Sequence, residues 1–272
     1  EYLKTINVDD YNFRLALSNE QLINKNMGIG ENIINKWKDS KKSFRYMNRI
    51  TLHHDKYPLK IDLSIIKESK KRGRNYILNY TMQEADVLNN KELYSIEIEL
   101  INDQIKDKLK TEEIIKVLRK CVRQVLCGFQ ETNYPLSYLK INELAKEYYY
   151  LLFKKELRNY LYNTNFISPG SYTLQLPNIV PINEDLEIPN IRNNYTVTEK
   201  ADGLRKLLFI NKEGIIVLMD TNMNIQGTGI KCNNKKLFNT ILDGEHITHN
   251  KKGDYINLYA AFDIYFLNEN NI

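Results

Sequence analysis

The stretch EKADGLR, Glu199 to Arg205, governs the interpretation of the C-terminal part of the chain. We expect Lys200 to end one strand and Arg205 to begin the next, with a turn at Asp202 between them. Such a turn holds a lysine amine and a guanidinium near one phosphate chain. The string K-x-D-G is short enough to occur by chance, so its meaning depends on the motifs downstream of it.

Two further apolar strands come after it in a fixed order. ILDGEHI carries Glu245 at a second strand and turn, and YAAFDIYF carries Phe262 within a third strand. The ordered set K-x-D-G-x-R, L-D-G-E and an aromatic strand with F-D resembles the covalent nucleotidyltransferase superfamily of mRNA guanylyltransferases and polynucleotide ligases. KEGIIVL (Lys212–Leu218) looks like that family's later E-G motif but precedes L-D-G-E, so we expect a hairpin turn at Glu213 and Gly214.

The resemblance implies a role for each matching residue. Lys200 would be the catalytic nucleophile, whose unprotonated amine attacks the α-phosphorus of GTP and forms a covalent lysyl-GMP. Arg205 would stabilise the phosphate charge together with a divalent metal, and Asp202 would lie at the nucleotide with it. Glu245 would contact the ribose or help to hold the metal, and Phe262 would stack on the base.

Three N-terminal segments alternate polar and apolar residues with the period of a strand. They are FRYMNRITLHH (Phe44–His54), LKIDLSII (Leu59–Ile66) and YSIEIEL (Tyr94–Leu100). The plain interpretation is a half-exposed antiparallel sheet whose charged side chains face water. The alternative is that the polar faces, which carry cations and closely spaced carboxylates, line an anion- and metal-binding barrel. Alternation alone leaves both interpretations open.

These three strands resemble the metal-dependent tunnel-fold RNA triphosphatases. Such domains are fused to guanylyltransferases in the multifunctional capping enzymes of nucleocytoplasmic large DNA viruses, of the mimivirus and asfarvirus kind. The resemblance implies that Glu97 and Glu99 bind Mg²⁺ or Mn²⁺ and that Asp62 supports the inner network. The residues that it assigns to the RNA 5′-triphosphate are Arg45, Arg49 and Lys60. Two departures are that no second E-x-E strand precedes Tyr11–Leu17 and that Met47 stands where a third basic residue is expected.

Helical spacing separates the two sets of strands. From Lys110 onward, Thr111 predicts a helix start and Gly128 its end, and a second helix is predicted from Ser137 to Tyr162. Prolines spaced through residues 163–194 then predict a domain boundary near residue 165. We therefore expect an α+β chain with an antiparallel β-tunnel triphosphatase domain at 1–165 and a guanylyltransferase domain of antiparallel sheets and helices at 166–272. We expect both domains to be truncated.

Composition excludes several other classes of protein. Lys and Arg number 39 against 34 for Asp and Glu, which gives a mild net charge of +5 that permits a polyanionic substrate. Three scattered cysteines fit neither a zinc site nor a disulfide scaffold. We find no apolar run near membrane-spanning length and no signal peptide, and therefore expect a cytoplasmic protein, in the host cell or the virion. The basic run at 67–74 is expected to be a solvated loop, with RNA contact as the alternative.

The leading hypothesis is a cap-forming enzyme. It would remove the γ-phosphate from the RNA 5′ end in a metal-dependent step and transfer GMP from GTP, through lysyl-GMP, to the diphosphate end. Its partners would be the RNA 5′ end and a cap methyltransferase, as a further domain or a subunit. The alternatives are an ATP-dependent DNA or RNA ligase, which shares the lysine chemistry, and a non-catalytic scaffold that binds RNA ends.

Overall fold

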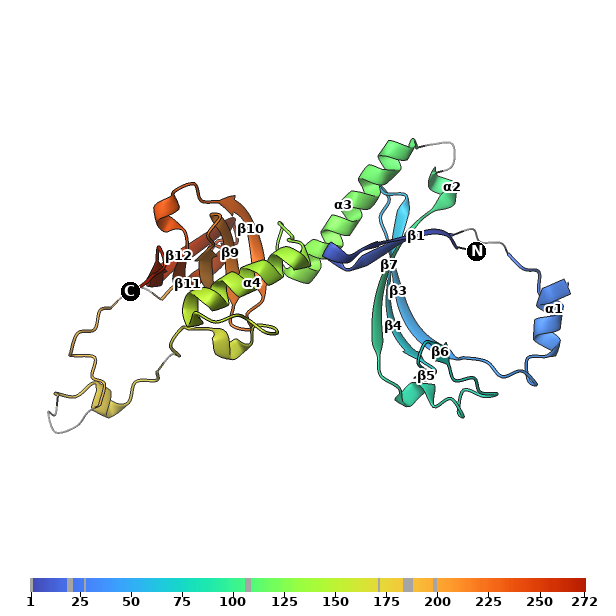
Figure 1. Cartoon of the computed structure of the whole chain (residues 1–272), viewed down its shortest axis with the longest axis horizontal. Helices are drawn as coiled ribbons and strands as arrows, with labels where there is room; N and C mark the ends of the chain where they lie inside the picture. The colour runs from blue at the N-terminus through green and yellow to red at the C-terminus, as the bar shows by residue number, and fades with distance from the viewer. Residues whose placement is uncertain are drawn as a thin grey trace. The chain divides into compact units, whose positions relative to one another are not determined.

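The structure of the protein is a computed structural model (Figure 1). It describes residues 2–18, 22–26, 28–105, 109–170, 172–182, 188–197 and 200–272. The described chain is α+β, and its strand pairings are antiparallel. Within these residues no helix combines the length and the apolar character that a membrane crossing requires. The chain divides into two compact units, unit 1 (Glu1–Asp9 and Phe13–Val125) and unit 2 (Asp10–Asn12 and Leu126–Ile272).

Unit 1 is built mainly from strands. Its first hairpin pairs β1 (Tyr2–Val8) with β2 (Phe13–Ser18). A three-stranded sheet has the order β3-β4-β7, formed by β3 (Arg45–His53), β4 (Leu59–Glu68) and β7 (Leu93–Leu100). The smaller elements are α1 (Gly28–Asn35), β5 (Lys71–Arg72), β6 (Asn75–Tyr76) and α2 (Asn102–Ile105).

The register of the three-stranded sheet gathers the predicted polar positions on one face. Thr51 on β3 pairs with Asp62 on β4, which in turn pairs with Glu97 on β7. Nearer the start of β4, Lys60 pairs with Glu99. Directly paired residues of antiparallel strands project from the same face of the sheet. The alternation predicted for these three strands is therefore confirmed.

Burial on β4 runs opposite to the plain interpretation, in which the charges face water. Asp62 and Ser64 are only 1% and 4% exposed, whereas Ile65 on the apolar side is 39% exposed. Ile50, which lies on the apolar side of β3, is 62% exposed. The polar face is therefore the more enclosed side of the sheet at β4.

The basic run at 67–74 is partly regular structure instead of one loop. Its first two residues complete β4, and Lys71–Arg72 form β5, which pairs with β6. Gly73 makes the tight turn between β5 and β6 with a φ of 62°, a left-handed conformation that glycine adopts without steric cost. The prediction of a loop was wrong for the strand residues, because a two-residue strand leaves no periodicity to detect.

Helix α3 (Thr111–Gln130) runs through the glycine that was predicted to end it. Gly128 lies inside the last turn, and the chain leaves the helix at Glu131, whose φ is 49°. The side chain of Gln130 then holds the following loop, because its amide donates to the Leu136 carbonyl and its Oε1 accepts from the Leu136 N–H, both at 2.8 Å. The end of α3 is thus fixed by the loop that comes after it.

Helix α4 (Tyr138–Phe153) begins where predicted and ends earlier. Ser137 is its N-cap, and the serine hydroxyl accepts from the Lys140 N–H at 3.2 Å. Lys154 ends the helix in a left-handed conformation with a φ of 51°, so the predicted extension to Tyr162 is wrong. The apolar spacing continues past this turn, and for that reason the sequence pattern overestimates the helix.

Unit 2 contains a six-stranded sheet in the order β10-β9-β8-β11-β12-β13. The strands are β8 (Leu204–Ile210), β9 (Ile215–Asp220), β10 (Ile225–Lys231), β11 (Thr240–His249), β12 (Tyr255–Leu267) and β13 (Asn270–Asn271). Helix α4 covers one face, where Leu144 and Tyr148 pack with Leu207 and Phe209 in a core without solvent exposure. Tyr148 is therefore a packing residue.

Strand β10 was not predicted, whereas the β8–β9 hairpin was. The sequence IQGTGIK contains two glycines, and its pairing with β9 shifts register between Gly227 and Lys231, so it lacks a regular alternation. The loop after α3 runs along it: the Thr132 hydroxyl donates to the Gly227 carbonyl, and a Cβ at Gly227 would lie 2.4 Å from the Tyr134 carbonyl oxygen. The hairpin turn predicted at Gly214 is confirmed, with a φ of 79°.

The predicted boundary near residue 165 does not coincide with the division by packing. Helix α4 precedes residue 165 but belongs to unit 2, because its apolar face completes the core of the six-stranded sheet. Between residues 163 and 194, the regular structure within the described residues consists of the short 3-10 turns Asn163–Asn165 and Leu176–Asn178. The functional domains at 1–165 and 166–272 stay a prediction.

Candidate active sites

Lys200 lies outside regular secondary structure, shortly before β8. The strand predicted for residues 195–200 is absent from 195–197 and from Lys200 itself, while Thr198 and Glu199 lie outside the described residues. The side chains of Lys200 and Asp202 are both exposed. The chain bends at Gly203, where a Cβ would approach the His246 carbonyl oxygen to 2.8 Å, so this position requires glycine. The segment that carries Lys200 thus leads into β8 through the bend at Gly203, which lies next to β11.

Arg205 and Glu245 lie side by side on neighbouring strands. They are direct partners in the pairing of β8 with β11. The Oε2 atom of Glu245 is buried and has no hydrogen-bond partner among the described residues. Burying a carboxylate oxygen that accepts no hydrogen bond costs folding free energy. We therefore expect a hydrogen-bond donor of a ligand, or a cation, at this oxygen. This atom is the strongest indication of a binding site in unit 2.

Phe262 on β12 completes this group. Its ring is 56% exposed, and the Arg205 guanidinium carbon lies 5.8 Å from the ring centroid. An exposed aromatic ring beside a cation offers a surface on which a planar base can stack. The structure therefore brings together Arg205, Glu245 and Phe262, whereas in the described part of the chain no hydrogen bond or ion pair joins Lys200 or Asp202 to any of these three.

The Arg205 guanidinium is held by groups that the sequence did not single out. Its Nη2 and Nε donate to the Asp243 carboxylate at 2.8 and 3.3 Å, and its Nη1 donates to the Pro169 carbonyl at 2.9 Å. Nη2 also contacts the Ser168 hydroxyl. The Tyr265 hydroxyl donates to Asp243 Oδ2 at 2.7 Å. Asp243 belongs to the L-D-G-E string and Tyr265 to the YAAFDIYF string, so both could have been chosen from the sequence, whereas no local signal identifies Ser168.

A second lysine, Lys206, lies on the opposite face of β8. Its side chain is 5% exposed, and its Nζ donates to Gln226 Oε1 at 2.5 Å and contacts His246 Nδ1 at 3.3 Å. Burial lowers the pKa of Lys206. Because its amine is enclosed by these partners and faces away from Glu245, we interpret Lys206 as structural.

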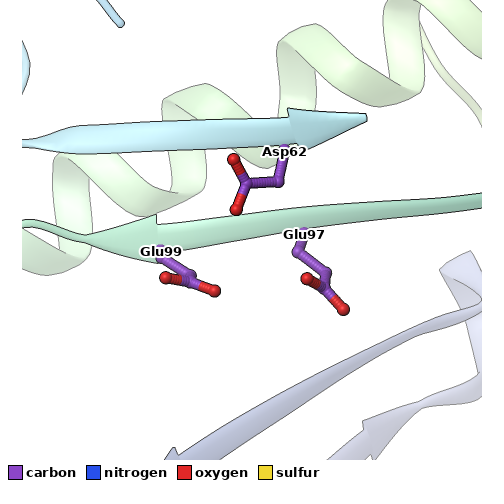
Figure 2. A group of neighbouring side chains, drawn as sticks. All are labelled: Asp62, Glu97 and Glu99. Atoms are coloured by element: carbon purple, nitrogen blue, oxygen red, sulfur yellow. The ribbon is translucent and has the colours of Figure 1, made fainter. Parts of the chain in front are cut away.

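The polar face in unit 1 holds a group of three carboxylates. Oxygens of Asp62, Glu97 and Glu99 lie within 4.8 Å of one another, and Figure 2 shows Asp62 on β4 beside Glu97 and Glu99 on β7. Asp62 is the buried member, and the two glutamates are exposed. Three hard oxygen donors at this spacing suit Mg²⁺ or Mn²⁺. The sequence identified the two glutamates as ligands and assigned Asp62 a supporting role only.

Two cations are interleaved with these carboxylates. Arg49 contacts Asp62 at 3.0 Å and Glu97 at 2.7 Å, while Lys60 contacts Glu99 at 2.8 Å and Asp62 at 3.6 Å. The contact with Glu99 raises the pKa of Lys60. The pKa of Asp62 is lowered chiefly by a hydrogen bond from the Thr51 hydroxyl, with Lys60 and Arg49 adding to it. Lys60 is therefore charged at neutral pH beside the acidic group.

Arg45 lies apart from this group. It occupies the far end of β3, where it pairs in register with Glu68 and contacts that carboxylate at 3.5 Å. Glu68 also accepts from Lys71 and from the Tyr76 hydroxyl, both at 2.6 Å. Of the three cations assigned to the triphosphate, the structure thus brings Arg49 and Lys60 to the carboxylates and gives Arg45 a different acidic partner.

Comparison with known proteins gives a family match for the C-terminal part of the chain. Residues 170–272 match the family "mRNA capping enzyme, catalytic domain". The chain is also 29% identical over 173 residues to a "Probable mRNA-capping enzyme" of Acanthamoeba polyphaga mimivirus. That alignment covers 64% of this chain and 12% of the relative, so the chain spans a small part of the relative's length. No solved structure is significantly similar to the chain.

Proposed function

We propose that the chain is a viral-type mRNA capping enzyme that forms the cap in two reactions, because residues 170–272 match the catalytic-domain family and the similar mimivirus protein is a probable capping enzyme. Unit 2 carries the guanylyltransferase reaction, with GTP as substrate and Lys200 as the covalent carrier of GMP. Unit 1 carries the RNA 5′-triphosphatase reaction. The observation that supports the first assignment most is the buried, partnerless Oε2 of Glu245, which lies next to Arg205 and near an exposed aromatic ring.

The proposed transfer has two balanced steps. The neutral amine of Lys200 attacks the α-phosphorus of GTP, so that a phosphorus–nitrogen bond forms, the bond to the β-phosphate oxygen breaks and pyrophosphate leaves. A terminal oxygen of the diphosphate RNA end then attacks the same phosphorus, and the lysine amine leaves. Arg205 stabilises the phosphate charge in both steps, and the Glu245 carboxylate accepts from a ribose hydroxyl.

The exposed ring of Phe262 stacks on guanine in this proposal. Asp202 lies in the segment between Lys200 and β8 and would face the phosphates or their metal. The capped product has a GMP joined to the RNA end, and a methyltransferase is the class of enzyme that would act on it next.

In unit 1, the proposed triphosphatase site uses both signs of charge. Arg49 and Lys60 bind the 5′-triphosphate of the RNA, and Asp62, Glu97 and Glu99 would hold a divalent metal. When bound, the metal polarises the γ-phosphate and favours attack by water. The donor set fits Mg²⁺ or Mn²⁺, because all three ligands are carboxylates. The enclosed polar face of β4 agrees with a tunnel lining, which completes the proposed domain at 1–165.

The guanylyltransferase assignment is tested by covalent labelling. The protein is incubated with α-labelled GTP or ATP and Mg²⁺ or Mn²⁺, denatured, and analysed for label on the Lys200 peptide. We expect label from GTP, its loss in Lys200→Ala, and its retention in Lys212→Ala, a matched exposed lysine on the β8–β9 turn. Label from ATP but not from GTP would identify a ligase instead.

The triphosphatase assignment needs a separate measurement. RNA with a γ-labelled 5′-triphosphate should release phosphate with Mn²⁺ or Mg²⁺, and release should stop on chelation of the metal. Glu99→Gln should reduce release, whereas Glu92→Gln, a change at an exposed glutamate just before β7 that pairs with Lys67, should not. If the wild-type protein bound such RNA without releasing phosphate, a scaffold that binds RNA ends would be the better explanation for unit 1.

A further inference from the structure

The hydrogen bonds of Arg205 leave one of its donors available. A guanidinium carries five N–H groups. Nε and one hydrogen of Nη2 go to Asp243, the other hydrogen of Nη2 goes to Ser168, and one hydrogen of Nη1 goes to the Pro169 carbonyl. The Arg205 side chain is nevertheless 31% exposed to solvent. The protein thus fixes four donors and leaves the fifth, on Nη1, without a partner among the described residues.

Asp243 is the centre of this arrangement. Its side chain has no solvent exposure, and a buried carboxylate is tolerated when its charge is paired and its oxygens are hydrogen-bonded. Besides the two bonds from Arg205, Oδ2 accepts from the Ser168 hydroxyl at 2.6 Å and from the Tyr265 hydroxyl at 2.7 Å. Burial is the main cause that raises the pKa of Tyr265 to about 12, so this hydroxyl stays protonated and remains a donor.

The cluster lies on the same face of β11 as the partnerless oxygen of Glu245. Asp243 and Glu245 are two residues apart on one strand, so their side chains project from the same face. Ser168 and Pro169 reach this face from the proline-containing segment after α4, which was predicted to hold a domain boundary. That segment is therefore tied to the candidate nucleotide site by its hydroxyl and its carbonyl.

We propose that Asp243, Ser168 and Tyr265 are positioning residues that orient the Arg205 guanidinium toward the phosphates of the nucleotide. This inference rests on the proposed guanylyltransferase function and extends it to residues outside the K-x-D-G-x-R string. Asp243 supplies the charge that holds the guanidinium, and the hydroxyls of Ser168 and Tyr265 hold Asp243. The remaining Nη1 donor of Arg205 then meets a phosphate oxygen without reorganisation during the reaction.

A purely structural role is the rival explanation, and two measurements separate it from positioning. The first is the ¹⁵N–¹H signal of the Arg205 Nε–H group, assigned through its loss in Arg205→Lys. The second is the rate of lysyl-GMP formation at saturating GTP, compared with the KM for GTP. A structural anchor would lower the midpoint of thermal unfolding and would leave the Arg205 signal, the rate and the KM as in the wild type.

We expect Tyr265→Phe and Ser168→Ala to broaden or shift the Arg205 Nε–H signal and to lower the saturated rate about 10-fold, with a smaller change in the KM for GTP. Asp243→Asn should lower the rate about 100-fold. Ser168→Thr keeps the hydroxyl and should restore most of the rate lost in Ser168→Ala. The matched control is Asp254→Asn, which alters an exposed aspartate in the β11–β12 turn whose partner is Asn250.

The outcomes separate this inference from the function on which it rests. If the wild-type protein forms lysyl-GMP and the Tyr265→Phe and Ser168→Ala variants keep the wild-type rate and Arg205 signal, positioning is refuted and the function stands. If the wild type forms no adduct, the proposed function fails, and the Arg205 signal still decides whether these hydroxyls orient the guanidinium. An Asp243→Asn variant that does not fold leaves the decision to the two milder variants.

Discussion

Thr51 is the residue that most strongly favours the charged form of Asp62. Its hydroxyl donates to Asp62 Oδ1 at 2.6 Å, and this bond is the largest cause of the lowered pKa. A carboxyl group whose pKa is lowered in the folded state adds stability above its unfolded pKa and loses it as the pH falls through the folded pKa. The contribution of Asp62 is therefore complete at neutral pH and lost in acid.

We expect Thr51→Val to raise the pKa of Asp62 toward the ordinary value of 3.8 and to lower the free energy of unfolding at neutral pH. A ¹³C titration of the Asp62 carboxyl gives the first quantity, and urea unfolding gives the second. On acidification the variant should lose less stability than the wild type, because the difference between the unfolded and folded pKa of Asp62 is smaller. Thr5→Val on exposed β1 is the control, and an Asp62 titration identical in both variants would contradict this account.

The sequence identified part of each site and missed the rest for one physical reason. Arg205, Glu245 and Phe262 could be selected because they lie in strings whose order carries chemistry. Ser168, by contrast, meets Asp243 across 75 residues of sequence, and alternation or helical spacing reports only neighbours along the chain. The pairing of Arg45 with Glu68 was likewise not predicted, because it depends on the register of β3 and β4 and not on residue type. The assignment of Arg45 to the triphosphate stays a prediction.

Helix α4 provides the test of how unit 2 is held together. Leu144 has no solvent exposure and packs in the core of the six-stranded sheet, whereas Leu139 on the same helix is 59% exposed. Leu144→Ala should lower the free energy of unfolding by about 2–5 kcal/mol, because it removes buried apolar surface and leaves a cavity. Leu139→Ala, the same chemical change on the exposed side, should stay within about 0.5 kcal/mol of the wild type. Equal losses in chemical denaturation would mean that α4 does not pack as described.

Strong periodicity made most of these elements predictable, and exceptions have local causes. β3, β4 and β7 follow from alternation, and α4 starts at its serine cap. The C-terminal ends of α3 and α4 could not be predicted. Each ends at a left-handed residue, such as Lys154, that is neither glycine nor asparagine and so carries no sequence signal. β10 was missed because its two glycines obscure the alternation of a strand.

The proposed function assigns one activity to each compact unit and therefore predicts that the two activities are separable. A Glu97→Gln variant should lose about 100-fold in γ-phosphate release and keep lysyl-GMP formation, while Lys200→Ala should show the reverse. An equimolar mixture of the two variants should then cap triphosphate RNA, because each supplies the activity that the other lacks. Cap formation is measured by transfer of label from α-labelled GTP to RNA, with each variant alone as control. Loss of both activities in either single variant would contradict independent sites.

The loop that runs along β10 has a consequence for the behaviour of the protein in solution. An outermost strand normally offers unpaired backbone groups to which another chain can add, and natural sheets block such borders with irregularities or covering segments. Here the Thr132 hydroxyl donates a hydrogen bond to the Gly227 carbonyl, and the Tyr134 ring packs on Gly229. The register shift of β10 also interrupts the regular ladder of backbone hydrogen bonds. This border is thereby closed to strand addition, which protects the concentrated protein from association through that side of the sheet.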